Sequence, residues 1–195
     1  MARLDEDRIR QLFEKSGALL TGHFLLSSGL HSGQYLEKFR LVENPEALEP
    51  MCAELAERFR EAGPQIVLGP TTAGIILAYN IARHLGVMAR FAEPASSGRA
   101  LRRGQTLPPH SRVLVVDDIL TTGLSVRECL DVVKEHGAEV VGVGVLADRS
   151  GGKADPGVRL EALWHADIPA YRPEECPLCR QGVPLTKPGS RAGIG

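Results

Sequence analysis

Between residues 65 and 146 the chain alternates short apolar runs with longer amphipathic segments. Apolar runs bounded by glycine and proline are typical of buried strands, and the segments between them have helical spacing. This rhythm predicts an α/β fold in which a central, mostly parallel sheet carries helices on both faces. The predicted strands are residues 65–68, 87–91, 113–116 and 140–146, and the predicted helices are residues 74–85 and 124–136. The helix at 74–85 is apolar almost all round, so we expect it to be buried.

The flanking segments are predicted to belong to the same single domain, residues 1–195. Residues 1–40 are expected to contain a short charged helix at 5–14, followed by loop and short strands rich in Gly, Ser and His. Residues 45–60 place their apolar side chains on one stripe and are predicted to form an amphipathic helix. Residues 150–195 are rich in Gly and Pro and predict no definite element.

A long polar segment, residues 92–109, interrupts the alternation. A segment of this length inside a compact domain is typical of a flexible loop. Gly98 and Gly104 would allow it to move as a lid over a site. An ordinary mobile surface loop is the alternative.

Composition and charge exclude several classes of partner. The 23 basic and 24 acidic residues give a net charge of −1, so no overall positive field attracts nucleic acid or a membrane surface. The first residues lack the apolar core of a signal peptide, and the longest apolar stretch, residues 73–82, is too short to span a bilayer. The four cysteines are too scattered for a disulfide framework. We therefore expect a cytoplasmic protein.

The most informative segment runs from Val113 to Ser125. Its first four residues predict a strand buried on both faces, and Asp117 and Asp118 follow at the carboxyl end, where open α/β sheets bind ligands. A turn of hydroxyl residues and glycine then begins a helix, and backbone N–H groups and hydroxyls at a helix N-terminus bind phosphate. Carboxylates beside such a site can accept hydrogen bonds from vicinal hydroxyls, so the segment fits a sugar phosphate.

Alternative explanations of these motifs are weaker. The acids and threonines could merely cap the next helix. A strand that ends in two acids also resembles the second motif of P-loop NTPases, but no G-x-x-x-x-G-K-[ST] motif occurs in the chain. Gly142, Gly144 and Ala147 imitate a dinucleotide-binding fingerprint, but they lie inside an apolar strand rather than after one.

The segment from Val113 to Ser125 resembles the signature with which type I phosphoribosyltransferases bind 5-phosphoribosyl pyrophosphate (PRPP). The resemblance implies the fold of that family, with a small N-terminal hood. It also implies that the two acids hold the ribose hydroxyls and that residues 121–125 hold the 5-phosphate. Leu124 departs from the glycine or small residue that many members carry. The PRPP-binding residues so implied are Asp117, Asp118, Ile119, Leu120, Thr121, Thr122, Gly123, Leu124 and Ser125.

The resemblance covers most of the chain and is most specific to the orotate phosphoribosyltransferases. Residues 24–32 are similar to the hood segment over the base, and residues 187–191 resemble the C-terminus of one bacterial branch. Residues 147–149 are similar to a strand end whose arginine, here Arg149, binds the orotate carboxylate, and Thr121 is implied to touch orotate as well. The pyrophosphate loop implied by the match consists of Thr71, Thr72, Ala73 and Gly74.

An arginine at the base site suits an anionic substrate, because Arg149 can bind a carboxylate through two hydrogen bonds. A salt bridge with Asp148 is the alternative. His31 and Tyr35 could line the base site or belong to ordinary packing. The resemblance implies transfer from PRPP to orotate by a homodimer, with Mg²⁺ held mainly by PRPP rather than by protein ligands. A phosphoribosyltransferase for another base and a PRPP-binding regulator without catalysis remain alternatives.

Two places depart from the usual pattern of the orotate enzymes, which often carry basic residues at the positions of Ser27 and of Glu93-Pro94. A departing pyrophosphate needs cations nearby as its charge builds. We therefore expect Arg102 and Arg103, in the long loop, to act as catalytic residues instead. The resemblance implies that this loop reaches the active site of the partner subunit. A solvated basic loop that never touches substrate is the alternative.

Cys176 and Cys179 have the spacing of half a zinc site or of a redox pair. Cys52 and Cys129 stand alone in predicted helices, and the sequence shows no neighbouring pair of histidines. A zinc site within one chain is therefore not expected. Two reduced thiols near the surface are the favoured interpretation, and a four-cysteine site shared by two copies of the chain is the alternative.

Overall fold

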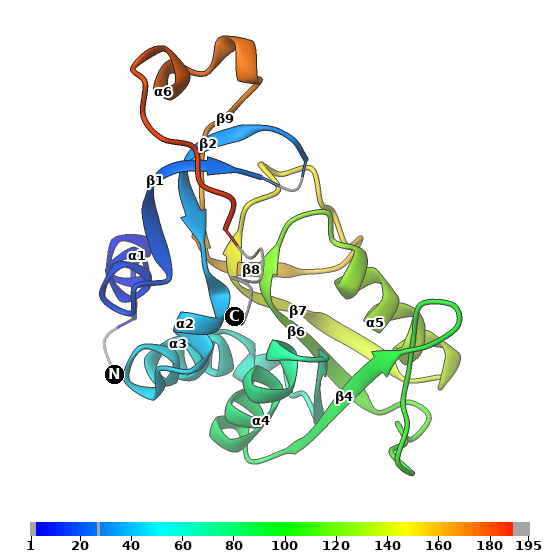
Figure 1. Cartoon of the computed structure of the whole chain (residues 1–195). Helices are drawn as coiled ribbons and strands as arrows, with labels where there is room; N and C mark the ends of the chain where they lie inside the picture. The colour runs from blue at the N-terminus through cyan, green and yellow to red at the C-terminus, as the bar shows by residue number, and fades with distance from the viewer. Residues whose placement is uncertain (1–2, 27, 189–195) are drawn as a thin grey trace, which may run out of the picture.

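Six strands form the central sheet of the computed structural model, which describes residues 3–26 and 28–188. They are β3 (Ile66–Pro70), β4 (Met88–Pro94), β5 (Arg99–Ala100), β6 (Arg112–Leu120), β7 (Glu139–Asp148) and β8 (Leu160–His165). Their order is β5-β4-β3-β6-β7-β8, and every neighbouring pair is parallel except β4 and β5 (Figure 1). The predicted sheet is confirmed. Ser27 and the last three residues of the 187–191 motif lie outside the described residues.

Helices cover both faces of this sheet, as predicted. One face carries α1 (Glu6–Lys15), α2 (Lys38–Val42), α3 (Pro45–Phe59) and α4 (Ala73–Leu85), and the other carries α5 (Leu124–Glu135). Side chains alternate along β6, so that Leu114 and Val116 belong to the first core while Val113 and Val115 belong to the second. Residues 113–116 of this strand are buried on both faces, which explains their continuous apolar sequence. Across the described ranges, no helix has the length and apolarity that crossing a membrane requires.

A second, antiparallel sheet forms the hood from β1 (Leu19–Leu25), β2 (His31–Leu36) and β9 (Ala170–Tyr171), in the order β1-β2-β9. The C-terminal chain then passes through the short helices η2 (Pro173–Glu175) and α6 (Pro177–Arg180). It returns to the hood, where Thr186 pairs with Phe24, and Figure 1 shows this stretch beside the β1–β2 hairpin. The N-terminal helix and short strands were predicted, but the contribution of residues 170–188 to the hood was not.

The sequence predictions need correction at three places. Helix α4 is not buried all round: Ile76 and Tyr79 are 41% and 65% exposed, because the helix turns only one face to the sheet. Residues 92–109 are not a loop throughout, since residues 92–94 continue β4 and β5 pairs back against it. Strand β8 lies within the segment for which no element was predicted, and it completes the edge of the sheet beside β7.

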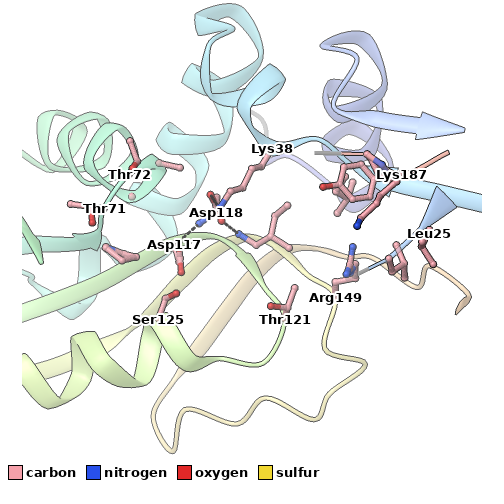
Figure 2. A pocket seen from close by; sticks show the side chains of 18 residues that line it. Leu25, Lys38, Thr71, Thr72, Asp117, Asp118, Thr121, Ser125, Arg149 and Lys187 are labelled. Atoms are coloured by element: carbon pink, nitrogen blue, oxygen red, sulfur yellow. Dashed lines mark hydrogen bonds and ion pairs between the residues drawn. The ribbon is translucent and has the colours of Figure 1, made fainter. Parts of the chain in front are cut away.

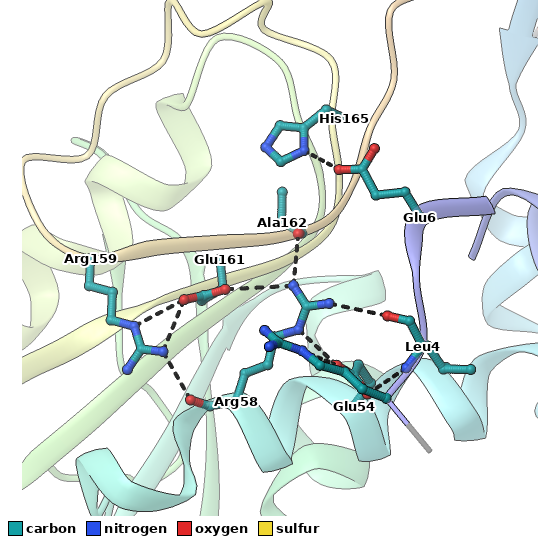
Figure 3. Close-up of polar contacts among 9 residues, drawn as sticks. Leu4, Glu6, Glu54, Arg58, Arg159, Glu161, Ala162 and His165 are labelled. Carbon is teal, nitrogen blue, oxygen red and sulfur yellow. Dashed lines mark hydrogen bonds and ion pairs between the residues drawn. The ribbon is translucent and has the colours of Figure 1, made fainter. Parts of the chain in front are cut away.

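A largely buried arginine connects the N-terminus to the sheet edge (Figure 3). Arg58 of α3 has a side chain only 13% exposed, and its Nε lies 2.9 Å from Glu54 Oε1. The same guanidinium donates to the carbonyl oxygens of Ala162 in β8, at 3.2 Å, and of Leu4, at 3.5 Å. Because a buried charge is tolerated only when it is paired and hydrogen-bonded, this network fixes where α1 and β8 lie on α3. Helix α1 leads directly into the hood, so the network also fixes the base of the hood.

The two glycines of the apparent dinucleotide fingerprint have a packing role. They lie within β7, where α3 crosses the sheet. A Cβ on Gly142 would lie 2.5 Å from the Phe59 ring, and one on Gly144 would lie 3.2 Å from it. Both positions therefore need glycine so that α3 can approach the sheet closely, and the nucleotide interpretation was correctly set aside.

Candidate active site

A cavity of about 680 Å³ opens between the carboxyl ends of the central strands and the hood (Figure 2). Strand β3 supplies Pro70, β6 supplies Asp117 and Asp118, and the hood supplies Leu25 and Tyr35. The carboxyl ends of parallel strands are the usual ligand-binding edge of an open α/β sheet. The cavity is therefore the candidate active site.

The two acids at the end of β6 are buried, with Asp117 8% and Asp118 3% exposed. The Asp118 N–H donates to Asp117 Oδ1 at 2.9 Å, and the Ile119 N–H donates to Asp118 Oδ1 at 2.6 Å. Lys38 of α2 places its Nζ 2.9 Å from Asp118 Oδ2. Burial, followed by the neighbouring charge of Asp118, raises the pKa of Asp117 to about 7. Lys38 thus forms an ion pair with Asp118. Asp117 has a pKa of about 7, so near neutral pH it is present in both the protonated and the ionised form.

The turn between β6 and α5 has the shape expected of the phosphate site. Gly123 has a φ of +73°, the left-handed region that favours glycine, and a Cβ there would lie 3.0 Å from Arg127 Nη1. That guanidinium donates to the Thr122 carbonyl oxygen at 2.8 Å and holds the turn in place. Thr121 and Ser125 line the cavity. Their hydroxyls and the N-terminal N–H groups of the 12-residue helix α5 can together bind a phosphate.

Residues 71–74, which form the turn after β3 and the first residues of α4, line the cavity as well. Two glycines close this turn tightly. A Cβ on Gly69 would lie 2.2 Å from the Gly74 carbonyl oxygen, and one on Gly74 would lie 2.7 Å from the Pro70 ring. The turn therefore keeps its backbone N–H groups and threonine hydroxyls at one end of the cavity, where the resemblance places pyrophosphate.

Arg99 stabilises the turn at Thr71 through its side chain. Its Nη1 donates to Thr71 Oγ1 at 3.3 Å and to the Ala92 carbonyl oxygen at 3.2 Å, and its Nε lies 3.1 Å from Glu128 Oε2. The side chain is only 12% exposed. One arginine of the long segment is thus committed to structure, because it joins β5, the turn after β3 and helix α5.

Arg149 enters the cavity from the end of β7, and Lys187 enters from the C-terminal segment (Figure 2). The Arg149 N–H donates to the Leu120 carbonyl oxygen at 2.8 Å, which fixes its backbone beside β6. No acidic side chain among residues 3–26 and 28–188 forms an ion pair with Arg149, and Asp148 Oδ1 instead accepts from the Ser150 N–H at 2.7 Å. The alternative salt bridge with Asp148 is therefore not formed, and the guanidinium is available to an anionic ligand.

The two candidate hood residues have different roles. Tyr35 lines the cavity and packs against Phe24, with ring centroids 5.9 Å apart. Its ring can therefore contact a planar base. His31 is buried outside the cavity lining and faces His23 and Cys179, so it is not placed at the base site.

Residues 41–159 match the phosphoribosyl transferase domain family. An orotate phosphoribosyltransferase from Pelotomaculum thermopropionicum is 48% identical over 188 residues, which cover 96% of this chain and 99% of that protein. The chain belongs to the orotate phosphoribosyltransferase family. The orotate phosphoribosyltransferase of Thermotoga maritima is also 48% identical, over 183 residues that cover 94% of this chain and 98% of that protein.

Solved structures of orotate phosphoribosyltransferases share the fold. The crystal structure from Aeropyrum pernix superimposes with a TM-score of 0.65 at 30% identity, over 80% of this chain and 92% of that chain. The Mycobacterium tuberculosis enzyme in complex with inorganic phosphate gives a TM-score of 0.66 at 25% identity, over 81% and 95% of the two chains. The fold implied by the signature is therefore confirmed.

Most of the residues predicted from the family signature meet at the cavity, but some do not. Leu120 is buried in the core beside α5. Arg103 forms an ion pair with Glu93 at 3.1 Å, and Arg102 donates to the Pro94 carbonyl oxygen at 3.3 Å, so both lie outside the lining. The predicted residues that line the cavity are Thr71, Thr72, Ala73, Gly74, Asp117, Asp118, Ile119, Thr121, Ser125 and Arg149, and those that do not are Arg102, Arg103, Leu120, Thr122, Gly123 and Leu124.

Two lysines of the cavity were missed. Lys38 follows the hood in a charged stretch, and nothing in its local sequence distinguishes it from a surface lysine. Lys187 begins the C-terminal motif whose likeness to one bacterial branch was noticed, and that likeness was the signal available for it. Both lysines add positive charge to a cavity for phosphorylated substrates.

The raised pKa of Asp117 makes a prediction about stability. Because the folded pKa of about 7 exceeds the ordinary value of 3.8, folding takes up a proton between these values, and Asp117 destabilises the protein increasingly as pH rises through this window. At pH 8, Asp117→Asn is expected to raise the free energy of unfolding by about 2–4 kcal/mol. The difference from the parent should shrink as pH falls and vanish below about pH 4.

Urea unfolding between pH 4 and pH 8 measures this difference. Asp131→Asn removes an exposed acid from α5 and is the matched control, for which little change is expected at any pH. An Asp117→Asn protein that is less stable than the parent at pH 8 would contradict the assignment of a buried, uncompensated charge.

Proposed function

We propose that this member of the family transfers the 5-phosphoribosyl group from PRPP to orotate, giving orotidine 5′-monophosphate and pyrophosphate. This reaction is a step of pyrimidine nucleotide synthesis. The observation that carries the proposal is that one cavity contains a phosphate turn, a buried acid pair and Arg149 without an acidic partner among the described residues. The names of the close relatives support orotate as the base.

The cavity supplies a separate group for each part of PRPP. Asp117 and Asp118 accept hydrogen bonds from the ribose hydroxyls, and the turn that begins at Thr121 binds the 5-phosphate. Residues 71–74 bind the pyrophosphate through backbone N–H groups and hydroxyls. Arg149 then binds the orotate carboxylate at the other end of the cavity, next to the hood.

The side chains present fit Mg²⁺ as cofactor, because the cavity offers carboxylate and hydroxyl oxygens, the donors that this ion prefers. Mg²⁺, held mainly by PRPP, would neutralise part of the charge that develops on the departing pyrophosphate. Lys38 and Lys187 add cationic charge to the same cavity. The chain needs no strong base, since orotate brings a nucleophilic nitrogen, and its residues position the substrates and exclude water.

A homodimer and a cytoplasmic location complete the proposal. Helix α4 and strand β4 pack together and expose Ile76, Tyr79 and Met88, which are 41%, 65% and 57% exposed. Exposed apolar side chains on two contacting elements suit a subunit interface. All four cysteines are free thiols, as is usual in the reducing cytoplasm.

Arg149 provides the test of base specificity. Arg149→Ala is expected to raise the Michaelis constant for orotate by about 10–100-fold, because a charge-assisted hydrogen bond contributes roughly 1.5–3 kcal/mol. The Michaelis constant for PRPP should change far less. Steady-state assays with Mg²⁺ that follow the absorbance of orotate measure both constants, and Arg149→Lys, which keeps the charge without the planar fork, should fall between the two proteins.

Parallel assays with other bases separate the alternatives. Faster turnover of adenine, hypoxanthine or uracil than of orotate would assign the site to another base. Binding of PRPP without turnover of any base would instead favour a regulator.

A further inference from the structure

Two histidines and two cysteines meet outside the active-site cavity. His23 and His31 lie on the facing strands of the hood hairpin, and Cys176 and Cys179 flank the start of α6. His23 and Cys176 are 153 residues apart in the sequence. Nevertheless, the four potential ligand atoms lie within 4.8 Å of one another. The expectation that no histidine pair neighbours the cysteines was therefore wrong.

Four of the six separations between these atoms are close to those of a tetrahedral metal site. Zinc binds imidazole nitrogen at about 2.0–2.1 Å and thiolate sulfur at about 2.3 Å, so tetrahedral ligands lie about 3.4 Å apart for two nitrogens and about 3.6 Å apart for nitrogen and sulfur. His23 Nε2 lies 3.1 Å from His31 Nδ1, 3.4 Å from Cys176 Sγ and 3.7 Å from Cys179 Sγ. Cys179 Sγ lies 3.2 Å from His31 Nδ1. Shifts of a few tenths of an ångström would bring these four separations to tetrahedral values, and the other two pairs of ligand atoms lie within 4.8 Å of each other.

The hydrogen bonding of His23 points in the same direction. Its Nδ1 lies 2.8 Å from the Val183 carbonyl oxygen, which can only accept, so Nδ1 is the donor, and in the neutral imidazole Nε2 then carries a lone pair. One lone pair can accept one hydrogen, yet three polar groups surround Nε2. A metal ion would bind all four groups at once. A metal-binding histidine usually donates its other N–H to a carbonyl in this way.

Burial and charge also suit a metal. Three of the four residues are buried, with His23 3%, His31 6% and Cys176 0% exposed, while Cys179 is exposed. Two thiolates and two neutral imidazoles balance the charge of a divalent ion, so the complex carries no net charge into the interior. Two nitrogens and two sulfurs in a tetrahedron select zinc among the divalent metals. A redox pair of cysteines would require neither histidine.

We propose that His23, His31, Cys176 and Cys179 bind one structural Zn²⁺ that joins the C-terminal segment to the hood. From this site the chain runs back along β1, where the Leu25 N–H donates to the Thr186 carbonyl oxygen at 2.9 Å. The next residue, Lys187, lines the active-site cavity. The zinc site therefore anchors the segment that brings a lysine to the cavity, but zinc binding itself does not depend on which reaction the cavity performs.

The test is the zinc content of the full-length protein, produced without an affinity tag in medium that contains zinc. The parent and Cys129→Ala, which removes a buried thiol of α5 outside the cluster, are expected to contain one zinc per chain by plasma mass spectrometry. Cys176→Ser combined with Cys179→Ser should lose it. Retention of zinc by this double variant would overturn the proposal.

Cobalt titration of the parent avoids any dependence on the folding of variants. After zinc is removed with a chelator, Co²⁺ should produce the thiolate charge-transfer band and the intense visible bands of a tetrahedral site, and added Zn²⁺ should abolish them. A parent protein without stoichiometric zinc and without these bands would overturn the proposal. So would a Cys176–Cys179 disulfide, found by mass spectrometry after alkylation under non-reducing conditions.

Discussion

Replacing Asp117 and Asp118 together by asparagine is expected to weaken the binding of PRPP by about 10²–10⁴-fold. We propose that each carboxylate accepts a charge-assisted hydrogen bond from a ribose hydroxyl, and each such bond contributes roughly 1.5–3 kcal/mol. Asparagine keeps the shape and one acceptor oxygen, so the Asp118 and Ile119 N–H groups retain their partners. Titration calorimetry with PRPP and Mg²⁺ measures the affinity.

The matched control is again Asp131→Asn, which should bind PRPP as the parent does because its side chain is exposed on α5. The double variant should remain folded, since removal of two neighbouring buried charges relieves repulsion rather than leaving a cavity. An unchanged affinity in a folded double variant would show that these acids do not hold the ribose. A double variant that loses PRPP binding and is more stable than the parent would show that Asp117 and Asp118 are kept for function although they destabilise the fold.

The central sheet could be predicted because its signals are local. Continuous apolar runs, helical spacing and the turn residues beside them lie within a few residues of one another, and both faces of strands such as β6 are buried. The same locality made one part of the cavity predictable, since Asp117, Asp118 and Ser125 belong to one segment from strand to helix. Residues 71–74 were implied only by the resemblance to a known family. The resemblance to a known family added Arg149, which the residues alone left ambiguous.

The contribution of residues 170–188 to the hood could not be predicted, because its contacts join distant parts of the chain. Strand β9 pairs with β2, and Thr186 returns to Phe24, but neither short segment has a pattern of its own. The cluster of His23 and Cys176 depends on the same return of the chain. Metal-site motifs are recognised from ligands that are close in sequence. The spacing of Cys176 and Cys179 could therefore be recognised, but the two histidines that the hood supplies could not.

The loop arginines carry the other large expected effect. Arg102→Ala combined with Arg103→Ala should lower kcat by about 10²–10³-fold, because a cation that meets the pyrophosphate as its charge develops acts mainly in the transition state. In the structure both side chains lie outside the cavity, and Arg103 is paired with Glu93. Arg103 donates two hydrogen bonds of 3.1 Å to Glu93, and this pair must break for Arg103 to reach the pyrophosphate. Steady-state kinetics with saturating PRPP and orotate measure kcat.

The control for this variant is Arg10→Ala, which likewise removes an exposed arginine paired with a glutamate of its own chain, on α1 far from the loop. It should keep the parent kcat. Equal kcat in the double variant and the parent would show that Arg102 and Arg103 are solvated residues that never contact substrate.

We propose that the loop acts on the other subunit of a homodimer. In Figure 1 the chain after β4 extends beyond the edge of the sheet, on the side away from the hood, and none of residues 95–109 lines the cavity of its own chain. A mixed dimer, with the double loop variant on one chain and Arg149→Ala on the other, tests this arrangement. If the loop acts on the partner's site, one site carries both defects and the other carries neither, so about half of the parent activity should remain. If it acts within its own chain, each site carries one defect and almost no activity should remain. That result would contradict the proposal that the loop acts on the partner's site.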